Sequence, residues 1–231
     1  MFIGILLIMY NFEKLASRFL TERVEGVRKV GIFPGAFKPP HFGHYVTALD
    51  AANSCDDLYI YLSSKSRELS THNKISGPEK PDSERYSNLF KTDKFSNNLL
   101  GVQCATCARP KLAGSMKKAS ASSIRAAISL KDKNTIIKNI PDGVDGDLIF
   151  NILMQSNNVD SEDYGYVTVE QSYEIWTLYK DQLIRNTNID VDRLHLIVSE
   201  VSPVKDTYDL VSELNESAEA GDISVHLYVG E

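Results

Sequence analysis

Short apolar runs alternate with amphipathic stretches along most of this chain. The apolar runs are rich in β-branched and aromatic residues and end at turn residues, which is typical of buried strands. They lie at 30–33, 57–62, 100–105, 194–198 and 225–229. Apolar residues at helical spacing occupy 45–52, 119–128, 168–184 and 206–215. This alternation predicts an α/β fold with a Rossmann-like, doubly wound parallel sheet.

The N-terminal segment sets the expected domain limits. Residues 11–25 have helical spacing and precede the first strand. We therefore expect 1–28 to form an N-terminal helical appendage and 29–231 to form a single α/β domain.

Local signals mark further boundaries inside that domain. Thr168 and Gln171 form a capping box that starts a long helix. The stretch 134–155 predicts short helices divided by Pro141. The polar, turn-rich stretch 69–94 predicts a long loop.

The stretch 30–52, VGIFPGAFKPPHFGHYVTALDAA, carries the candidate chemistry. It predicts a strand, a tight turn at Pro34–Gly35 and then a helix. In such a unit, unpaired backbone N–H groups and the positive end of the helix dipole can cradle a phosphate. His41 and His44 can both reach one anion there. We expect the glycine of the turn to let the backbone approach the phosphate, and Gly43 to keep the space between the imidazoles clear.

A chance H-x-x-H in a surface turn would be the plain alternative, but the stretch also resembles a known signature. It is similar to the HxGH motif of the nucleotidylyltransferase superfamily, whose members transfer a nucleoside monophosphate from an NTP to a phosphorylated acceptor. Its PPHFGH form is most similar to nicotinamide-mononucleotide adenylyltransferases and to cytidylyltransferase-like proteins of phages. The matching positions are Gly35, Phe37, Pro39, Pro40, His41, Gly43 and His44.

The resemblance implies roles for these residues. His41 and His44 would donate hydrogen bonds to phosphate oxygens in the transition state. Lys38 would add a positive charge, with Lys117 or Lys118 as other candidates. The nucleotide would lie against Gly35, Ala36, Phe37 and Gly43.

A second stretch, 119–128, resembles the I-S-x-T-x-I/V-R element of the same superfamily. The positions in register are Ser120, Ser122, Ile124 and Arg125. The resemblance implies that Arg125, in the first turn of a helix, holds the β- and γ-phosphates. Ser120 or Ser122 would cap this helix, and Ser123 would complete the nucleotide site. A capped surface helix with a solvated arginine is the alternative.

The loop after the second strand is the candidate acceptor site. Ser64, Lys65 and Arg67 follow that strand at the end where open α/β sheets place their ligands. Hydroxyl and cationic groups suit an anionic substrate. A solvated loop would have the same composition, and both readings stay open.

The order of segments departs from the family pattern. In the family, the stretch resembling 163–231 precedes the Ser-x-Ser-x-x-Arg helix, whereas here it follows that helix. Moving 165–231 in front of 80–155 restores the family order. We therefore expect a rearranged chain order, with Glu231 close to Lys80 if the fold is kept.

Composition narrows the function classes. A formal net charge of −6 argues against a nucleic-acid partner. Three cysteines make no disulfide framework and no complete zinc site, so no structural metal is expected. No stretch predicts a membrane span or a signal peptide, so we expect a cytoplasmic protein without a membrane partner. His195 and His226 lie inside strands, where a structural role is expected. The oligomeric state cannot be inferred from the sequence.

The expected activity is therefore nucleotidyl transfer with release of pyrophosphate. Mg²⁺ would accompany the NTP, held mainly by the nucleotide and water. The motif favours ATP and a nucleotide-like acceptor such as nicotinamide mononucleotide. CTP with a phosphorylated alcohol and a nucleotide-binding module without turnover are the alternatives. A fragment of a class I aminoacyl-tRNA synthetase, suggested by HFGH and the stretch 115–120, is disfavoured by the short chain and acidic charge.

Overall fold

A computed structural model describes residues 26–65, 67–68, 99–107, 121–155, 166–219 and 221–230. Its strands are β1 (Arg28–Gly35), β2 (Asp57–Ser63), β3 (Arg67–Glu68), β4 (Leu99–Cys107), β5 (Tyr166–Val167), β6 (Leu194–Ser199) and β7 (Ile223–Gly230). Its α-helices are α2 (Phe42–Ser54), α4 (Ala121–Ser129), α5 (Lys133–Ile137), α6 (Gly146–Gln155), α7 (Val169–Asn186) and α8 (Pro203–Ser217), and a 3-10 turn spans Val191–Arg193.

The sequence-predicted strands and helices that fall within these residues are confirmed. The helix expected at 11–25 and the loop expected at 69–94 lie outside the described residues. Arg28, assigned from sequence to the appendage, opens β1. Thr168 and Gln171 form the expected capping box of α7. Pro141 lies between α5 and α6, as expected.

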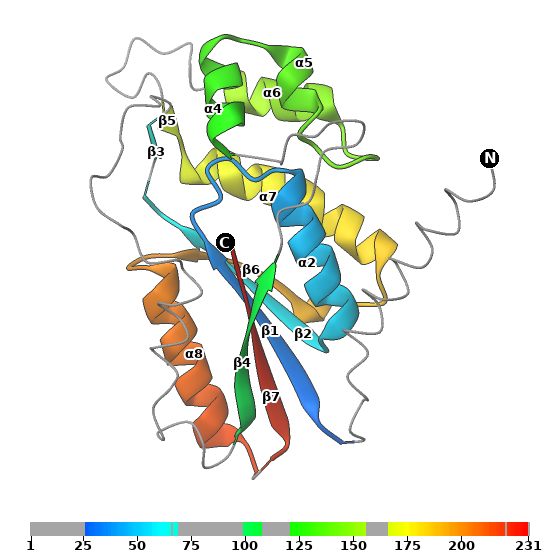
Figure 1. Cartoon of the computed structure of the whole chain (residues 1–231), viewed down its shortest axis with the longest axis vertical. Helices are drawn as coiled ribbons and strands as arrows, with labels where there is room; N and C mark the ends of the chain where they lie inside the picture. The colour runs from blue at the N-terminus through cyan, green and yellow to red at the C-terminus, as the bar shows by residue number, and fades with distance from the viewer. Residues whose placement is uncertain are drawn as a thin grey trace, which may run out of the picture.

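Five of the strands form one parallel sheet with β1 at its centre (Figure 1). The spatial order is β4-β7-β1-β2-β6, and every neighbouring pair is parallel. Because all strands point the same way, the segments that follow β1, β2 and β6 emerge at one end of the sheet. The doubly wound α/β fold predicted from the alternation of elements is confirmed.

The chain order of the strands is rearranged, although their spatial order is regular. In a regular doubly wound sheet, strands numbered by their order along the chain lie side by side in the order 3-2-1-4-5. Counting this sheet's strands in the order β1, β2, β6, β7, β4 gives the same arrangement, with β6 as the third strand and β4 as the fifth. Moving the β6 and β7 region in front of β4 is the rearrangement expected from the sequence motifs.

A small antiparallel pair shows where the chain departs from the regular order. Arg67 of β3 pairs with Val167 of β5, and Glu68 pairs with Tyr166. This pair places the end of the β2 segment beside the start of α7, although β4, α4, α5 and α6 lie between β3 and β5 in the sequence. The expected approach of Glu231 to Lys80 lies outside the described residues.

An apolar core lies on each face of the sheet, where side chains of the strands and of the helices pack together. One core packs α2 and α7 on one face and extends to α4, α5 and α6 beyond the end of the sheet (Figure 1), and its largest buried side chains include Trp176 and Tyr179. The other core packs α8 against the opposite face, around Val211 and Leu214. Within the described part of the chain, no helix is long and apolar enough to cross a membrane.

Candidate functional site

The loop between β1 and α2 is shaped by one aromatic side chain. β1 continues through Pro34 and Gly35, so the expected turn begins later, and Phe37 adopts a φ of 49°. A Cβ at position 35 would lie 2.6 Å from ring carbons of Phe37. Gly35 therefore makes room for the Phe37 ring. The approach of the backbone to a phosphate at Gly35, expected from the sequence, stays a prediction.

Phe37 anchors the loop to an aromatic cluster. Its ring lies 4.8 Å from Phe33, 5.2 Å from Trp176 and 4.9 Å from His44, measured between ring centroids. Such edge-to-face contacts add to the apolar burial. The loop is thus fixed to β1, to α7 and to the first turn of α2 at once.

His41 and His44 form the N-terminal cap of α2. The backbone N–H of Gly43 donates to Nδ1 of His41 over 3.0 Å, and the N–H of His41 donates to Nδ1 of His44 over 3.3 Å. Together these bonds make a capping box, the reciprocal arrangement usually built from Ser or Thr with Glu or Gln. The orientation of each imidazole ring is therefore set by a hydrogen bond within the capping box.

The capping bonds select one tautomer for both rings. A nitrogen that accepts a hydrogen bond carries no proton, so the neutral imidazole of His41, like that of His44, has its proton on Nε2. The two rings are stacked, with centroids 3.7 Å apart and planes 24° from parallel. Two Nε2–H donors are thus presented by adjacent rings.

Two sequence expectations about the backbone here are wrong. The imidazoles stack against each other, so Gly43 does not keep a space between them open. The first N–H groups of α2 are also occupied: His41 and Gly43 donate to the imidazoles, and Phe42 donates to the Asn139 carbonyl over 2.7 Å. Any anion at this place would therefore depend on the histidine side chains rather than on those backbone donors.

Lys38 is buried in the same loop. It is 2 % exposed, and its Nζ has no hydrogen-bond partner in the part of the chain that the structure describes. Burial lowers the pKa of Lys38 to about 8, and the nearby carboxylate of Glu170 partly opposes the shift. The pKa of Glu170 is lowered by its own backbone N–H, by Thr168 and by the charge of Lys38. A buried cation therefore lies in the same loop as the two imidazole donors.

Arg125 joins the second motif to the first. Its Nη1 donates to the carbonyl oxygen of Lys38 over 2.9 Å, although the two residues are 87 positions apart. Arg125 lies in the second turn of α4, which begins at Ala121, and not in the first turn as expected. The structure thus brings His41, His44, Lys38 and Arg125 to one region, as the two motifs predicted.

The predicted nucleotide-binding residues are only partly described. Ala36 and Phe37 lie in the loop, and Ser123 is exposed on α4. Ser122 is inside α4, so it is not the cap, and its side chain lies outside the described residues, as does all of Ser120. Lys117 and Lys118 also lie outside them.

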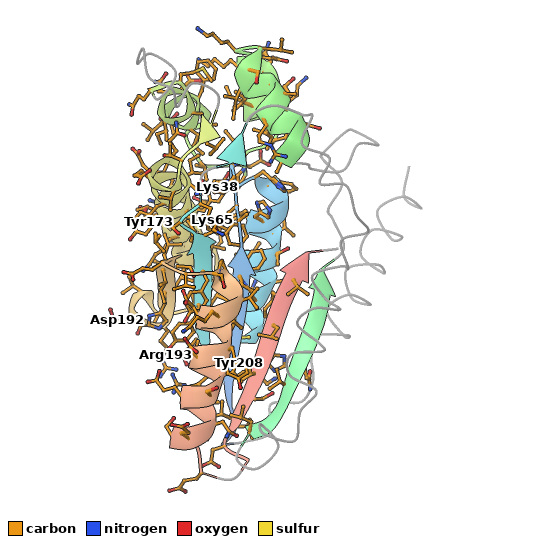
Figure 2. All side chains as sticks on the ribbon, turned by 90° about the vertical axis from the view of Figure 1, so that its left-hand side faces the viewer. Lys38, Lys65, Tyr173, Asp192, Arg193 and Tyr208 are labelled. Carbon is orange, nitrogen blue, oxygen red and sulfur yellow. The ribbon has the colours of Figure 1, made fainter. Side chains whose placement is uncertain are left out.

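The predicted acceptor residues follow β2 at the same end of the sheet as the loop. The Ser64 hydroxyl donates to the Glu200 carbonyl over 3.4 Å. Lys65 is exposed, and its N–H donates to the Ser63 hydroxyl over 3.3 Å. Figure 2 shows Lys38 and Lys65 at this end of the sheet, with the side chains of Asp192 and Arg193 farther toward the other end. Of Arg67, only the backbone is described.

His195, His226 and Cys55 have structural partners. His195 stacks on Tyr59, with centroids 4.3 Å apart, and Nε2 of His226 lies 3.1 Å from the Ser224 hydroxyl. Burial lowers the pKa of both imidazoles. Cys55 is not in a disulfide, and burial raises its pKa to about 11. These residues have the surroundings of core groups.

Two neighbours of the site were missed from the sequence. Asn139 closes the first N–H of α2 through its carbonyl, which no side-chain pattern could indicate. Glu170 lies near Lys38 and stands between Thr168 and Gln171, the two residues of the α7 capping box. Its place in the first turn of a helix was visible, but its approach to the loop depends on how α7 packs.

Comparisons of the chain with models of protein families, with curated proteins and with solved structures found no match. The assignment of a function therefore depends on the residues and geometry of this site.

Proposed function

We propose that the protein is a nucleotidylyltransferase related to the HxGH superfamily. The supporting observation is the histidine capping box, which directs the ring protons of His41 and His44 to Nε2. Two such donors from stacked rings suit the oxygens of a phosphate. The convergence of Arg125 and Lys38 on the same region supports the same proposal.

The reaction is an in-line substitution at the α-phosphorus of an NTP. An oxygen of the acceptor phosphate forms the new P–O bond, the bond to the β-phosphate oxygen breaks, and pyrophosphate leaves with the bonding electron pair. His41 and His44 stabilise the charge on the oxygens of the crowded α-phosphoryl group. Lys38 and Arg125 contribute positive charge, and positioning supplies most of the remaining effect. No covalent enzyme intermediate is required.

The donor set fits phosphate better than a metal ion. Among the described residues, no group of three His, Cys, Asp or Glu side chains is placed to hold a metal. Imidazole N–H, ammonium and guanidinium groups bind oxyanions. Mg²⁺ would arrive with the NTP, held by phosphate oxygens and water, and would neutralise phosphate charge.

For the substrates we propose ATP and a nucleotide-like acceptor, with nicotinamide mononucleotide as the first to test. The proposal rests on the PPHFGH form of the motif, and on Ser64 and Lys65 at the adjacent strand end. CTP with a phosphorylated alcohol is the alternative.

Pyrophosphate release tests the proposal. The purified protein is incubated with Mg²⁺ and each of the four NTPs, over a panel of phosphorylated acceptors that includes nicotinamide mononucleotide and phosphorylated alcohols. We expect release with one NTP and one acceptor. The same release from His44→Asn as from wild type would contradict the proposal, and so would silence across the panel. Tight NTP binding in a silent protein would indicate a binding module.

A further inference from the structure

Within the described part of the chain, Lys38 has no counterion. Its side chain is 2 % exposed, its Nζ lacks a hydrogen-bond partner among the described residues, and no described carboxylate lies within ion-pair distance of it. A buried ammonium without a partner is costly, and natural folds rarely keep one without a use. The site is therefore incomplete until a negative group enters.

The charged and titratable groups around Lys38 do not provide that negative group. Glu170 on α7 acts on Lys38 only through space, and it lies exposed at the surface. Arg125 on α4 is itself a cation, and His41 and His44 on α2 present N–H donors. Arg125, His41 and His44 are suited to binding an oxyanion, which is also the ligand that the Lys38 ammonium would bind.

Arg125 contacts the backbone of Lys38 rather than its side chain. Its Nη1 donates to the Lys38 carbonyl over 2.9 Å. The preceding residue, Phe37, has a positive φ and is packed against Trp176, so the loop is held from both sides. A residue that fixes the carbonyl also fixes the direction in which the lysine side chain leaves the loop.

We propose that Lys38 binds a phosphate group of the substrate and that Arg125 is a positioning residue, which aims Lys38 by holding its carbonyl oxygen. The choice of a phosphate as the anion rests on the proposed function. This role differs from direct binding of the β- and γ-phosphates by Arg125, which the motif alone implied.

The burial of Lys38 gives the proposal a measurable signature. Its pKa is about 8 without a ligand, so near pH 8 about half of the molecules carry the charge. A bound phosphate favours the charged form and raises this pKa. Ligand binding near pH 8 must then take up protons, at about 0.5 proton per ligand bound.

Calorimetry of the full chain measures this uptake. ATP and CTP are titrated in turn, without Mg²⁺, at pH 8 in two buffers of different ionisation enthalpy. A third arm uses nicotinamide mononucleotide alone, which separates an NTP phosphate from an acceptor phosphate. We expect proton uptake in one arm, and none in Lys38→Met. Lys38→Arg should bind without uptake, because a guanidinium does not lose its proton at this pH.

A double-mutant cycle tests the role of Arg125. Arg125→Ala and Lys38→Met should each weaken binding of the responsive ligand by ~10–100-fold, the usual range for a charged hydrogen bond. If Arg125 acts through Lys38, the double variant should bind about as weakly as Lys38→Met alone. Additive losses would show that Arg125 binds the phosphate directly. They would overturn the positioning role.

The outcomes separate this inference from the proposed function. Proton uptake that disappears in Lys38→Met, in a protein that releases no pyrophosphate, would support the phosphate site and reject the transferase. Pyrophosphate release with equal uptake in wild type and Lys38→Met would support the transferase and overturn the inference. Thermal unfolding of each variant confirms that it is folded.

Discussion

Two buried charged side chains lie at opposite ends of the parallel sheet, and they differ in whether a described residue neutralises the charge. Asp57, 4 % exposed at the start of β2, accepts a hydrogen bond from Arg28 over 2.7 Å, with Arg193 4.0 Å away. Lys38, 2 % exposed at the other end, has no such partner among the residues described. Figure 2 shows Lys38 and Arg193 well apart along the sheet.

Under the proposal, this difference separates a structural charge at Asp57 from a functional charge at Lys38. The Asp57 carboxylate is neutralised inside the chain, so it can contribute to stability without a ligand. The Lys38 ammonium lowers stability until an anion arrives. Local rules are usually broken at functional sites, where the stability that is lost serves binding. Variants at the Asp57 end should therefore alter unfolding, and variants at the Lys38 end should alter turnover.

The largest effect is expected at the histidines. His44→Ala should lower turnover by at least ~100-fold, because a preorganised contact to transition-state charge is lost. The matched control is His195→Ala, which removes a half-buried imidazole from β6. Steady-state pyrophosphate release measures both. Equal losses in the two variants would mean that the carboxyl end of the sheet has no special role.

The reverse pattern is expected at Asp57. Asp57→Ala should lower the free energy of unfolding by ~3 kcal/mol, because it leaves Arg28 without its partner and opens a buried site. Urea denaturation measures this loss, with exposed Asp192→Ala as the control. Turnover per folded molecule should stay near that of wild type. A loss of turnover per folded molecule would contradict the claim that Asp57 serves stability alone.

Gly35 tests whether the loop is held by packing. Gly35→Ala places a methyl group 2.6 Å from the Phe37 ring, so the ring must move. We expect a loss of ~2 kcal/mol in the free energy of unfolding, typical of overpacking, together with reduced turnover. Gly26→Ala is a spatial control, because no atom lies within 4 Å of its added methyl group, although its positive φ adds backbone strain. A loss at Gly35 no larger than that at Gly26 would contradict the packing role.

The smallest expected effect has the opposite sign. Lys38→Met should raise the free energy of unfolding at pH 7 by ~1 kcal/mol, because it removes a buried charge. The folded pKa of about 8 lies below the usual 10.5, so the unfolded chain binds more protons between these values. The free energy of unfolding of wild type should therefore approach that of Lys38→Met as the pH rises from 8 to 10.5. Urea midpoints at pH 7 and pH 10 check this convergence, and a constant difference would contradict it.

The sequence predicted the elements, the doubly wound sheet and the rearranged order, because apolar periodicity and the order of the motifs are both visible along the chain. It also identified the histidine pair. It could not show that Arg125 meets the carbonyl of a residue 87 positions away, or that Asn139 occupies an N–H of α2. The role expected for Gly43 was wrong because it depended on the side-chain positions of His41 and His44, which only packing decides. The contact of the Phe37 ring with Gly35 likewise depends on packing.

The pKa of the Lys38 ammonium, measured by NMR of the lysine ε-carbon, tests the central claim most directly. Lys38→Arg identifies the signal. We expect a pKa of about 8 in the protein alone, rising well above that value when the responsive nucleotide or acceptor is added. A value near 10.5 without ligand, or one that saturating ligand leaves unchanged, would contradict a buried cation kept for a phosphate.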